Sequence, residues 1–202
     1  MGYHPNFFEK EDKNAVRKNC FNRLKLILEN IDTNKENMLD AGCSGGYYSF
    51  GLSDKFTNIL AIDNQEDLIE NCNKIKVDNN IDNVDFKKMD LTEIILDKQK
   101  YDCILYLSTH HHVCQQNGFK KATEILLDLS KKTNMMFFDM GQKDENCFSY
   151  AWWKELPELL NVSSQKEWLY NYLTENTVFK NFSIIGTSPI HGTRRFLWKM
   201  EK

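Results

Sequence analysis

Apolar and polar residues alternate along this chain with two different periods. Residues 11–30 repeat apolar side chains every three to four positions with charged side chains between them, which predicts an amphipathic helix. Short apolar runs at 37–41 and 58–63 predict buried strands. Each run is followed by a segment with helical spacing, at about 46–54 and 65–78.

The same alternation continues through the middle of the chain. Further apolar runs predict strands at 84–89, 101–107 and 134–140, with a helix at 118–131. Strands that are separated by helical crossovers pair in parallel. The pattern therefore predicts an α/β fold with a doubly wound, mostly parallel seven-stranded sheet and helices on both faces.

The pattern changes after Gly141. An aromatic-rich segment at 147–174 has helical spacing, and two last strands are predicted at 178–186 and 193–200. The connection at 187–192 is too short for a crossover, so these two strands form a C-terminal hairpin and one of them runs antiparallel to the rest.

The turn after the first predicted strand is rich in small residues, Gly42-Cys43-Ser44-Gly45-Gly46. Such residues let the backbone approach a ligand closely, and the helix that follows directs its free N–H groups toward the turn. In an open parallel sheet, ligands bind beyond the carboxyl ends of the strands. An ordinary tight turn with a helix cap would have the same composition.

Acidic residues end three successive predicted strands, at Asp40, Asp63 and Asp90. Asp63 lies 23 positions after Asp40, close to the ~20-residue separation at which an acidic side chain reaches ribose hydroxyls. Asp90 is placed to meet an adenine amino group while Leu91 packs on the ring. Any one of these acids alone could be a helix cap, but three in order indicate a cofactor that carries a nucleoside.

The successive segments DAGCSGG, LAIDN, KKMDL, YDCILYLS and FFDMG cover roughly residues 37–141. In this order they resemble the motifs of class I, Rossmann-like S-adenosylmethionine-dependent methyltransferases. The resemblance implies that S-adenosyl-L-methionine is the cofactor and that S-adenosyl-L-homocysteine is its product. The chain has Ser44 at the middle glycine of the family's D-x-G-x-G-x-G motif, a variation that we expect a tight turn to accommodate.

The resemblance also implies roles for particular residues. Asp40, Gly42, Cys43 and Ser44 are expected around the methionine portion of the cofactor, Asp63 at the ribose, and Asp90 and Leu91 at the adenine. The expected cofactor set also includes Gly45, Asn64 and Ser108. The rival on this architecture is a dinucleotide-dependent oxidoreductase, but its G-x-G-x-x-G fingerprint needs glycines where this chain has Ser44 and Tyr47.

Three histidines, His110, His111 and His112, follow the fourth predicted strand. Methyl transfer from a sulfonium requires alignment and exclusion of water, and a neutral acceptor must also lose a proton to a base. Histidine, with a pKa of ~6.5, suits that role. An S-x-x-H-H pattern in the resembling family matches Ser108, His111 and His112, and His111 is the first choice as base.

Two other roles are open for these histidines. They could cap the following helix, or they could line a pocket without moving protons. A metal site is disfavoured because consecutive residues do not converge readily on one ion, and no matching cysteine or histidine spacing accompanies them. No metal is therefore predicted.

The methyl acceptor is expected under aromatic segments at residues 3–8 and 141–153, with Gln142 and Trp152 as candidate contacts. Simple core packing is the alternative for these aromatic residues. Arg194 and Arg195 are adjacent, so on a strand only one of them faces the acceptor. Arg194 is chosen, and with His191 it could bind a phosphate or carboxylate of the acceptor.

Composition narrows the partners. The net charge is −3, which argues against nucleic acid as a partner because binding a polyanion needs many Lys and Arg side chains. The six cysteines include no C-x-x-C pair, which indicates reduced thiols and a cytoplasmic protein. No apolar run approaches the ~20 residues that cross a bilayer, and the first ten residues show no secretory signal, so no membrane association is expected.

The predicted organisation is a single methyltransferase domain over 1–202. Its parts are an N-terminal lid and helix at 1–36, a cofactor-binding core at 37–141, a helical substrate-side insert at 142–175 and a terminal β-hairpin at 176–202. The expected activity is O-methylation of a small molecule, such as a sugar, a phosphorylated metabolite or a specialised-metabolite precursor, by a monomer or homodimer. The alternatives are a tRNA or protein methyltransferase, and a non-catalytic S-adenosylmethionine-binding subunit.

Overall fold

The computed structural model describes residues 7–8, 15–31, 35–96, 98–142, 145, 162–190 and 193–202. The chain divides into two compact units, Met1–Leu105 and Tyr106–Lys202. Strand β4 (Tyr101–Leu107) crosses the boundary between them. Within the described ranges, no helix combines the length and the apolar character that crossing a membrane requires.

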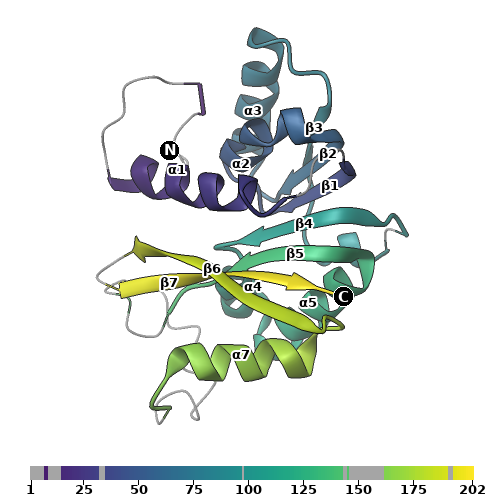
Figure 1. Cartoon of the computed structure of the whole chain (residues 1–202). Coiled ribbons are helices and arrows are strands. Elements are labelled where there is room, and N and C mark those ends of the chain that lie inside the picture. Colours follow the sequence, from purple (N-terminus) through teal and green to yellow (C-terminus); the bar gives the residue numbers. More distant parts are fainter. Residues whose placement is uncertain are drawn as a thin grey trace. The chain divides into compact units, whose positions relative to one another are not determined.

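The first unit is built on parallel strands (Figure 1). Strand β1 (Lys35–Ala41) pairs in parallel with β2 (Phe56–Asp63) and with β4, and β2 pairs in parallel with β3 (Val84–Lys88). Successive residues of β1, such as Met38 and Leu39, are fully buried although they point to opposite sides of the strand. This burial on both faces explains why the strands are read in the sequence as continuous apolar runs.

The helices of this unit are α1 (Ala15–Leu28), α2 (Tyr47–Gly51) and α3 (Glu66–Asp78), with short 3-10 turns at η1 (Ser53–Lys55) and η2 (Ile94–Leu96). Helix α3 buries one stripe, formed by Leu68, Ile69, Cys72 and Ile75, against the neighbouring strands. These positions follow the helical period that the sequence shows. Burial of the stripe therefore stabilises the packing of α3 through the hydrophobic effect.

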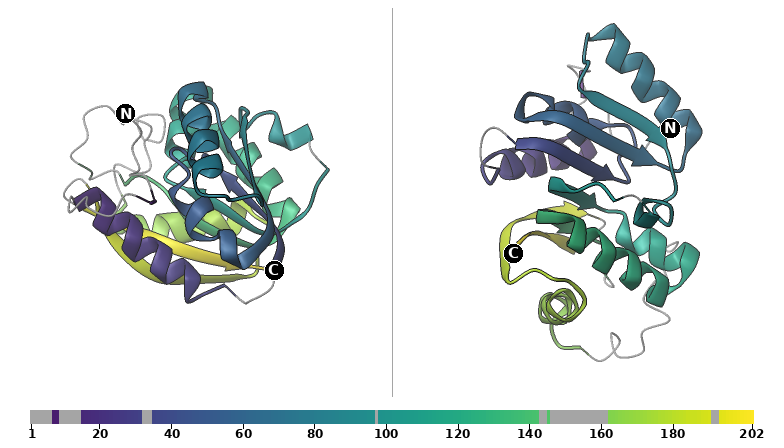
Figure 2. Two further views of the ribbon diagram at one scale, coloured as in Figure 1. Left: turned by 90° about the horizontal axis from the view of Figure 1, so that it is seen from above. Right: turned by 90° about the vertical axis from the view of Figure 1, so that its right-hand side faces the viewer.

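The second unit contains an antiparallel arrangement. Strand β7 (Thr193–Glu201) pairs in antiparallel with β5 (Thr133–Asp139) on one side and with β6 (Asn181–Ile190) on the other. Helices α4 (His110–Asn117), α5 (Phe119–Lys132) and α7 (Gln165–Asn176) complete it. Helix α7 runs along the β6–β7 hairpin, as the views in Figures 1 and 2 show.

Neighbouring strands follow the order β3-β2-β1-β4-β5-β7-β6, which makes a mixed seven-stranded sheet. This confirms the predicted α/β class and the antiparallel C-terminal hairpin. The doubly wound arrangement, the helices on both faces and the single domain over 1–202 stay predictions.

The predicted connection at 187–192 was wrong in its first part, because Thr187–Ile190 belong to β6. The sequence analysis took Pro189 as a turn residue. However, β6 is an edge strand, and a proline is tolerated there because its missing N–H does not interrupt a ladder on the open side. A bulge between Ile184 and Gly186 further disguised the strand in the sequence.

The segment after β4 was also misread. The sequence analysis predicted no helix between 107 and 118, whereas the three histidines form the first turn of α4. His110, Val113 and Cys114 are buried on one face of this helix, but the pattern is hidden because one member of the stripe is a histidine. Gly118, with φ of 81°, ends α4 and separates it from α5.

We predict that Gly46→Ala destabilises the protein by about 2 kcal/mol. Gly46 has φ of 73°, and a Cβ there would lie 2.9 Å from Cε1 of Phe86 and 3.0 Å from Cε2 of Phe50. The backbone strain and the overpacking both oppose folding. Urea denaturation measures the change, with the exposed helix substitution Lys74→Ala as a control. Equal midpoints for the Gly46→Ala variant and the wild type would contradict the prediction.

Candidate functional site

The turn at the end of β1 has an unusual backbone. Gly42, Ser44 and Gly46 all have positive φ, at 88°, 49° and 73°. The N–H groups of Gly42 and Cys43 both donate to the carbonyl of Ile62 in β2, at 2.9 Å each. The serine therefore does fit the tight turn, and the turn is anchored to the end of the neighbouring strand.

Asp63 holds this turn through its side chain. Its Oδ2 accepts from the N–H of Ser44 at 2.9 Å, and its Oδ1 accepts from the N–H of Gln65 at 3.0 Å. The carboxylate is half-buried at the carboxyl end of β2, so each oxygen keeps a second acceptor position. Asp63 thus stabilises the local backbone, and its role at the ribose stays a prediction.

Asp40 is buried behind the turn. Its Oδ2 accepts from the hydroxyl of Ser49 at 2.6 Å, and the residue is 2% exposed. Burial, with a smaller contribution from the charge of Asp63, raises the pKa of Asp40 to about 7 despite the Ser49 hydrogen bond. A cationic group placed beside Asp40 would favour its charged form, and the α-ammonium group of a bound methionine moiety is such a cation.

Two thiols lie against the turn. The Sγ atoms of Cys43 and Cys72 are 3.8 Å and 3.5 Å from the carbonyl oxygen of Ser44. Burial raises the pKa of Cys72 to about 12 and the pKa of Cys43 well above its ordinary value. Because the thiolate is the reactive form, both cysteines serve as neutral packing groups rather than as nucleophiles.

The remaining predicted cofactor residues of this unit lie near the same strand ends. Asp90 follows β3, and its Oδ1 accepts from both the N–H and the hydroxyl of Thr92, at 2.8 Å and 2.7 Å. Leu91 is half-buried, Gly45 is half-buried within the turn, and Asn64 is exposed directly after β2. Their contacts with a cofactor stay predictions.

In the second unit, Ser108 directly follows β4 and resembles Ser44 in its backbone. It has φ of 54°, and Oδ1 of Asp139 accepts from its N–H at 2.8 Å and from its hydroxyl at 2.9 Å. Nη1 of Arg195 donates to the same hydroxyl at 2.9 Å. These buried partners fix the serine in its strained conformation.

Arg195 is the centre of a buried ion pair. Its Nε and Nη2 donate to the two carboxylate oxygens of Glu145 at 2.5 Å and 2.7 Å, a bidentate arrangement in which both side chains are 3% exposed. Glu145 also accepts from the N–H of Gln142. The predicted acceptor contact Gln142 is itself buried, with its Nε2 bonded to the carbonyl of Met140.

The adjacent arginine behaves differently from what the sequence analysis chose. Arg194 is exposed, and its Nη1 donates to the hydroxyl of Thr187. The inward-facing member of the pair is therefore Arg195, because its alternate position on β7 turns it toward the interior. The sequence could not separate the two, since both residues carry the same side chain.

His110 is a structural residue. It is fully buried, with Nδ1 3.3 Å from the hydroxyl of Tyr106 and Nε2 2.9 Å from the hydroxyl of Tyr172. Burial lowers its pKa to about 3, so the ring is neutral near pH 7. With both ring nitrogens bonded to tyrosines, His110 does not suit the catalytic role that the sequence analysis allowed for it.

His111 is also buried, and its tautomer is fixed. Nδ1 accepts from the backbone N–H of Gly141 at 3.0 Å, so the neutral ring carries its proton on Nε2. Burial and the charge of Arg195 hold the pKa of His111 well below its usual range. A neutral ring with this tautomer can donate a hydrogen bond through Nε2, but its Nδ1 lone pair is already occupied by the Gly141 N–H. This argues against the choice of His111 as the first base.

His112 is the accessible histidine of the three. It is half-buried, and its ring lies 4.3 Å from that of His111, measured between centroids. In the portion of the chain that the structure describes, no group of three or more His, Cys, Asp or Glu side chains gathers as metal ligands. Trp152, His191 and the predicted lid residues 3–6 lie outside the described residues.

A family model described as a methyltransferase domain matches residues 32–177 of this chain. The chain belongs to the class I S-adenosylmethionine-dependent methyltransferase family. The strand-end carboxylates and the left-handed turn described above fall inside the matched range.

Individual relatives agree with this assignment. The O-antigen chain terminator bifunctional methyltransferase/kinase WbdD of Escherichia coli is 29% identical over 142 residues, covering 66% of this chain and 20% of the relative. A medium-resolution structure of the bifunctional kinase-methyltransferase WbdD superposes with a TM-score of 0.80 at 23% identity, over 98% of this chain and 43% of that one. The chain thus spans about a fifth of the length of the curated relative that it matches.

A further solved structure shares the fold. The N-terminal domain of EvdMO1, described as determined in the presence of SAH and D-fucose, has a TM-score of 0.67 at 11% identity, with 98% of this chain and 91% of that chain covered. At this level of identity the likeness concerns the fold alone.

Some residues of the buried network in the second unit were not selected from the sequence. Asp139 was present in the quoted segment FFDMG, and its place at the end of a strand, like Asp40 and Asp63, was a signal that could have found it. Glu145 and Arg195 carried no such signal, because their pairing joins residues that are 50 positions apart.

We predict that the free energy of unfolding falls as the pH rises from about 4 to about 7, because of Asp40. Its folded pKa of about 7 lies above the usual ~3.9 of an unfolded aspartate, so in this window the folded chain holds a proton that the unfolded chain has released. The loss is up to about 4 kcal/mol. Asp40→Asn keeps an acceptor for Ser49 and should remove this fall, measured by urea denaturation at pH 5 and pH 8. The exposed variant Asp78→Asn should retain it, and an unchanged fall in Asp40→Asn would refute the assignment.

We predict a strong coupling between Arg195 and Glu145. Arg195→Met leaves a buried carboxylate unpaired and should cost about 3–5 kcal/mol, whereas the double variant with Glu145→Met should lose much less than the sum of the single losses. A double-mutant cycle in urea should give a coupling of about 2 kcal/mol or more. The exposed pair Lys88 and Glu66, 2.8 Å apart, is the matched control, with an expected coupling below about 1 kcal/mol. Similar couplings for the two pairs would count against the buried network.

Proposed function

We propose that the protein transfers a methyl group from S-adenosyl-L-methionine to a hydroxyl oxygen of a small molecule. A sugar is the acceptor that we favour. The observation that supports this activity is the turn after β1, which contains three left-handed residues, one of them bonded to the strand-end acid Asp63, and which lies inside a methyltransferase domain match. A sugar acceptor is supported by the structural relative described with D-fucose, although that likeness is one of fold.

The residues of the first unit fit the cofactor by their chemistry. Asp63 offers acceptor positions to ribose hydroxyls, Asp90 offers a carboxylate to the adenine amino group, and Asp40 offers a buried carboxylate to the ammonium of the methionine portion. The turn at Gly42 and Ser44 exposes backbone to the same end of the sheet. When bound, the cofactor supplies an electrophilic methyl group on a sulfonium.

In the second unit, we infer that His112 rather than His111 takes the proton of the acceptor hydroxyl. His111 has its Nδ1 lone pair occupied by Gly141, and its ring is stabilised in the neutral form by burial beside Arg195. It is therefore a positioning residue, whose ring packs against that of His112 and sets its orientation. His112, half-buried, can exchange protons with an acceptor.

Ser108 and Arg195 stabilise the backbone that precedes the histidines. Ser108 donates to Asp139 and accepts from Arg195, and these buried bonds fix the backbone two residues before α4 begins. Because all three guanidinium nitrogens of Arg195 are engaged within the unit, this side chain does not serve as an acceptor-binding group. Its role is to hold the strand end that leads into the histidines.

The expected result is that His112→Ala lowers kcat by about 10²–10⁴-fold while the affinity for the cofactor is unchanged. Turnover is followed as S-adenosyl-L-homocysteine release with a panel of neutral and phosphorylated sugars, and affinity by calorimetry. The acid limb of the pH–rate profile should disappear in this variant. His111→Asn should keep that limb, although it should lower stability because Gly141 loses its hydrogen-bond partner.

The reverse pattern would return the role of base to His111. If His111→Asn abolished the acid limb and His112→Ala left it intact, our assignment would be wrong. If S-adenosyl-L-homocysteine and S-adenosyl-L-methionine both failed to bind the wild-type chain, the proposed activity itself would fall.

A further inference from the structure

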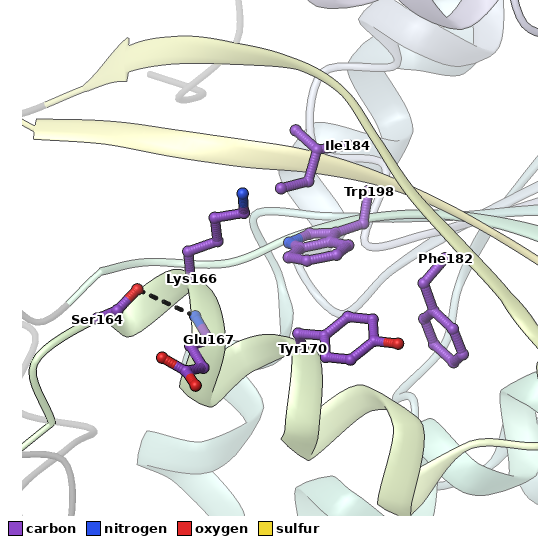
Figure 3. A pocket seen from close by; sticks show the side chains of 7 residues that line it. All are labelled: Ser164, Lys166, Glu167, Tyr170, Phe182, Ile184 and Trp198. Carbon is purple, nitrogen blue, oxygen red and sulfur yellow. Dashed lines mark hydrogen bonds between the residues drawn. The ribbon is translucent and has the colours of Figure 1, made fainter.

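The second unit contains an open pocket between α7 and the β6–β7 hairpin. Its volume is about 530 Å³, within the range of small-molecule sites. Figure 3 shows its lining, with aromatic side chains from both elements and polar side chains from the start of α7. The lining residues are Ser164, Lys166, Glu167, Tyr170, Phe182, Ile184 and Trp198.

This pocket lies on the opposite face of β7 from the buried arginine network. Side chains alternate along a strand, so Trp198 and Arg195, three positions apart, point to opposite sides. The bulge of the hairpin is in β6, so it does not disturb the alternation of β7. The pocket is therefore distinct from the cluster around Ser108.

One polar atom of the pocket has no partner. The indole Nε1 of Trp198 is buried, in a residue that is 2% exposed, and it makes no hydrogen bond. Figure 3 shows this nitrogen on the edge of the ring that faces the part of the pocket near Lys166. A buried donor without an acceptor is costly, which indicates that something else supplies the acceptor.

The side chains that line the pocket indicate the chemistry of its ligand. The ring of Tyr170 is 45% exposed and lies 6.2 Å from that of Trp198 and 5.8 Å from that of Phe182, measured between centroids. These rings form an aromatic wall against which the C–H face of a sugar ring can pack. Around it stand an ammonium group, a carboxylate and a hydroxyl, so both donors and acceptors are present.

We propose that this pocket binds a neutral saccharide, with one of its hydroxyl oxygens accepting from Nε1 of Trp198. A hydroxyl both donates and accepts, which matches the mixed groups of the rim. A purely apolar ligand would leave the indole N–H unpaired, and an anion would be opposed by Glu167 as much as it is attracted by Lys166. The test of this proposal does not depend on methyl transfer, because binding is measured without the cofactor.

The test follows the indole N–H resonance of Trp198 in the ¹⁵N-labelled full chain, assigned by its loss in Trp198→Phe. Neutral trisaccharides of glucose, galactose, mannose and N-acetylglucosamine are titrated separately. At least one should shift this resonance saturably. Tyr170→Ala should weaken that binding by about tenfold, and Trp198→Phe, which keeps a ring but loses the donor, by about fivefold in calorimetry.

Matched controls separate the pocket from the rest of the surface. Phe21→Ala removes another exposed aromatic ring, on α1, and should leave binding unchanged. Lys166→Ala should weaken binding, whereas Lys180→Ala, also exposed, should not. These lysine variants keep the test valid even where Tyr170→Ala fails to fold.

Three results would overturn the proposal. The first is a resonance that none of the sugars moves but that exchanges magnetisation with a bound water, which would mean that water alone is the acceptor. The second is a shift caused by nucleosides or by free indole and not by sugars. The third is equal binding by the wild type and the Tyr170→Ala and Lys166→Ala variants.

Discussion

In each unit, an aspartate at the end of one strand accepts a hydrogen bond from a left-handed serine that follows a neighbouring strand of the sheet. Asp63 of β2 accepts from the N–H of Ser44, and Asp139 of β5 accepts from the N–H of Ser108. Serine rarely adopts positive φ, so each turn needs an external hydrogen bond to stabilise it. The backbone that leads into α2 and α4 depends on these two bonds.

This constraint also determines the electrostatics. Burial raises the pKa of Asp40, and the charge of the Asp63 carboxylate that holds the Ser44 turn adds a smaller increase. Around Ser108 the negative charge of Asp139 is accompanied by Arg195, which in turn is paired with Glu145. The carboxylates around Ser108 are thus compensated by a guanidinium within the second unit.

The three consecutive histidines differ in burial, and we therefore propose different roles for them. Three identical side chains in succession face different surroundings because a helix turns by about 100° per residue. His110 lies among tyrosines, His111 contacts a backbone amide, and His112 keeps contact with solvent. His112 is the least buried of the three, which is why our proposal assigns the base to it.

The sequence by itself determined the α/β class, the strands of the core, the C-terminal hairpin and the family, because buried strands and strand-end acids are local patterns. It did not determine that α4 begins at the histidines or that β6 continues through Pro189, since a buried histidine and an edge-strand proline mimic loops. Only the tertiary structure decided between Arg194 and Arg195 and paired the latter with Glu145. Such a choice depends on which distant groups surround a side chain, and no local pattern records that.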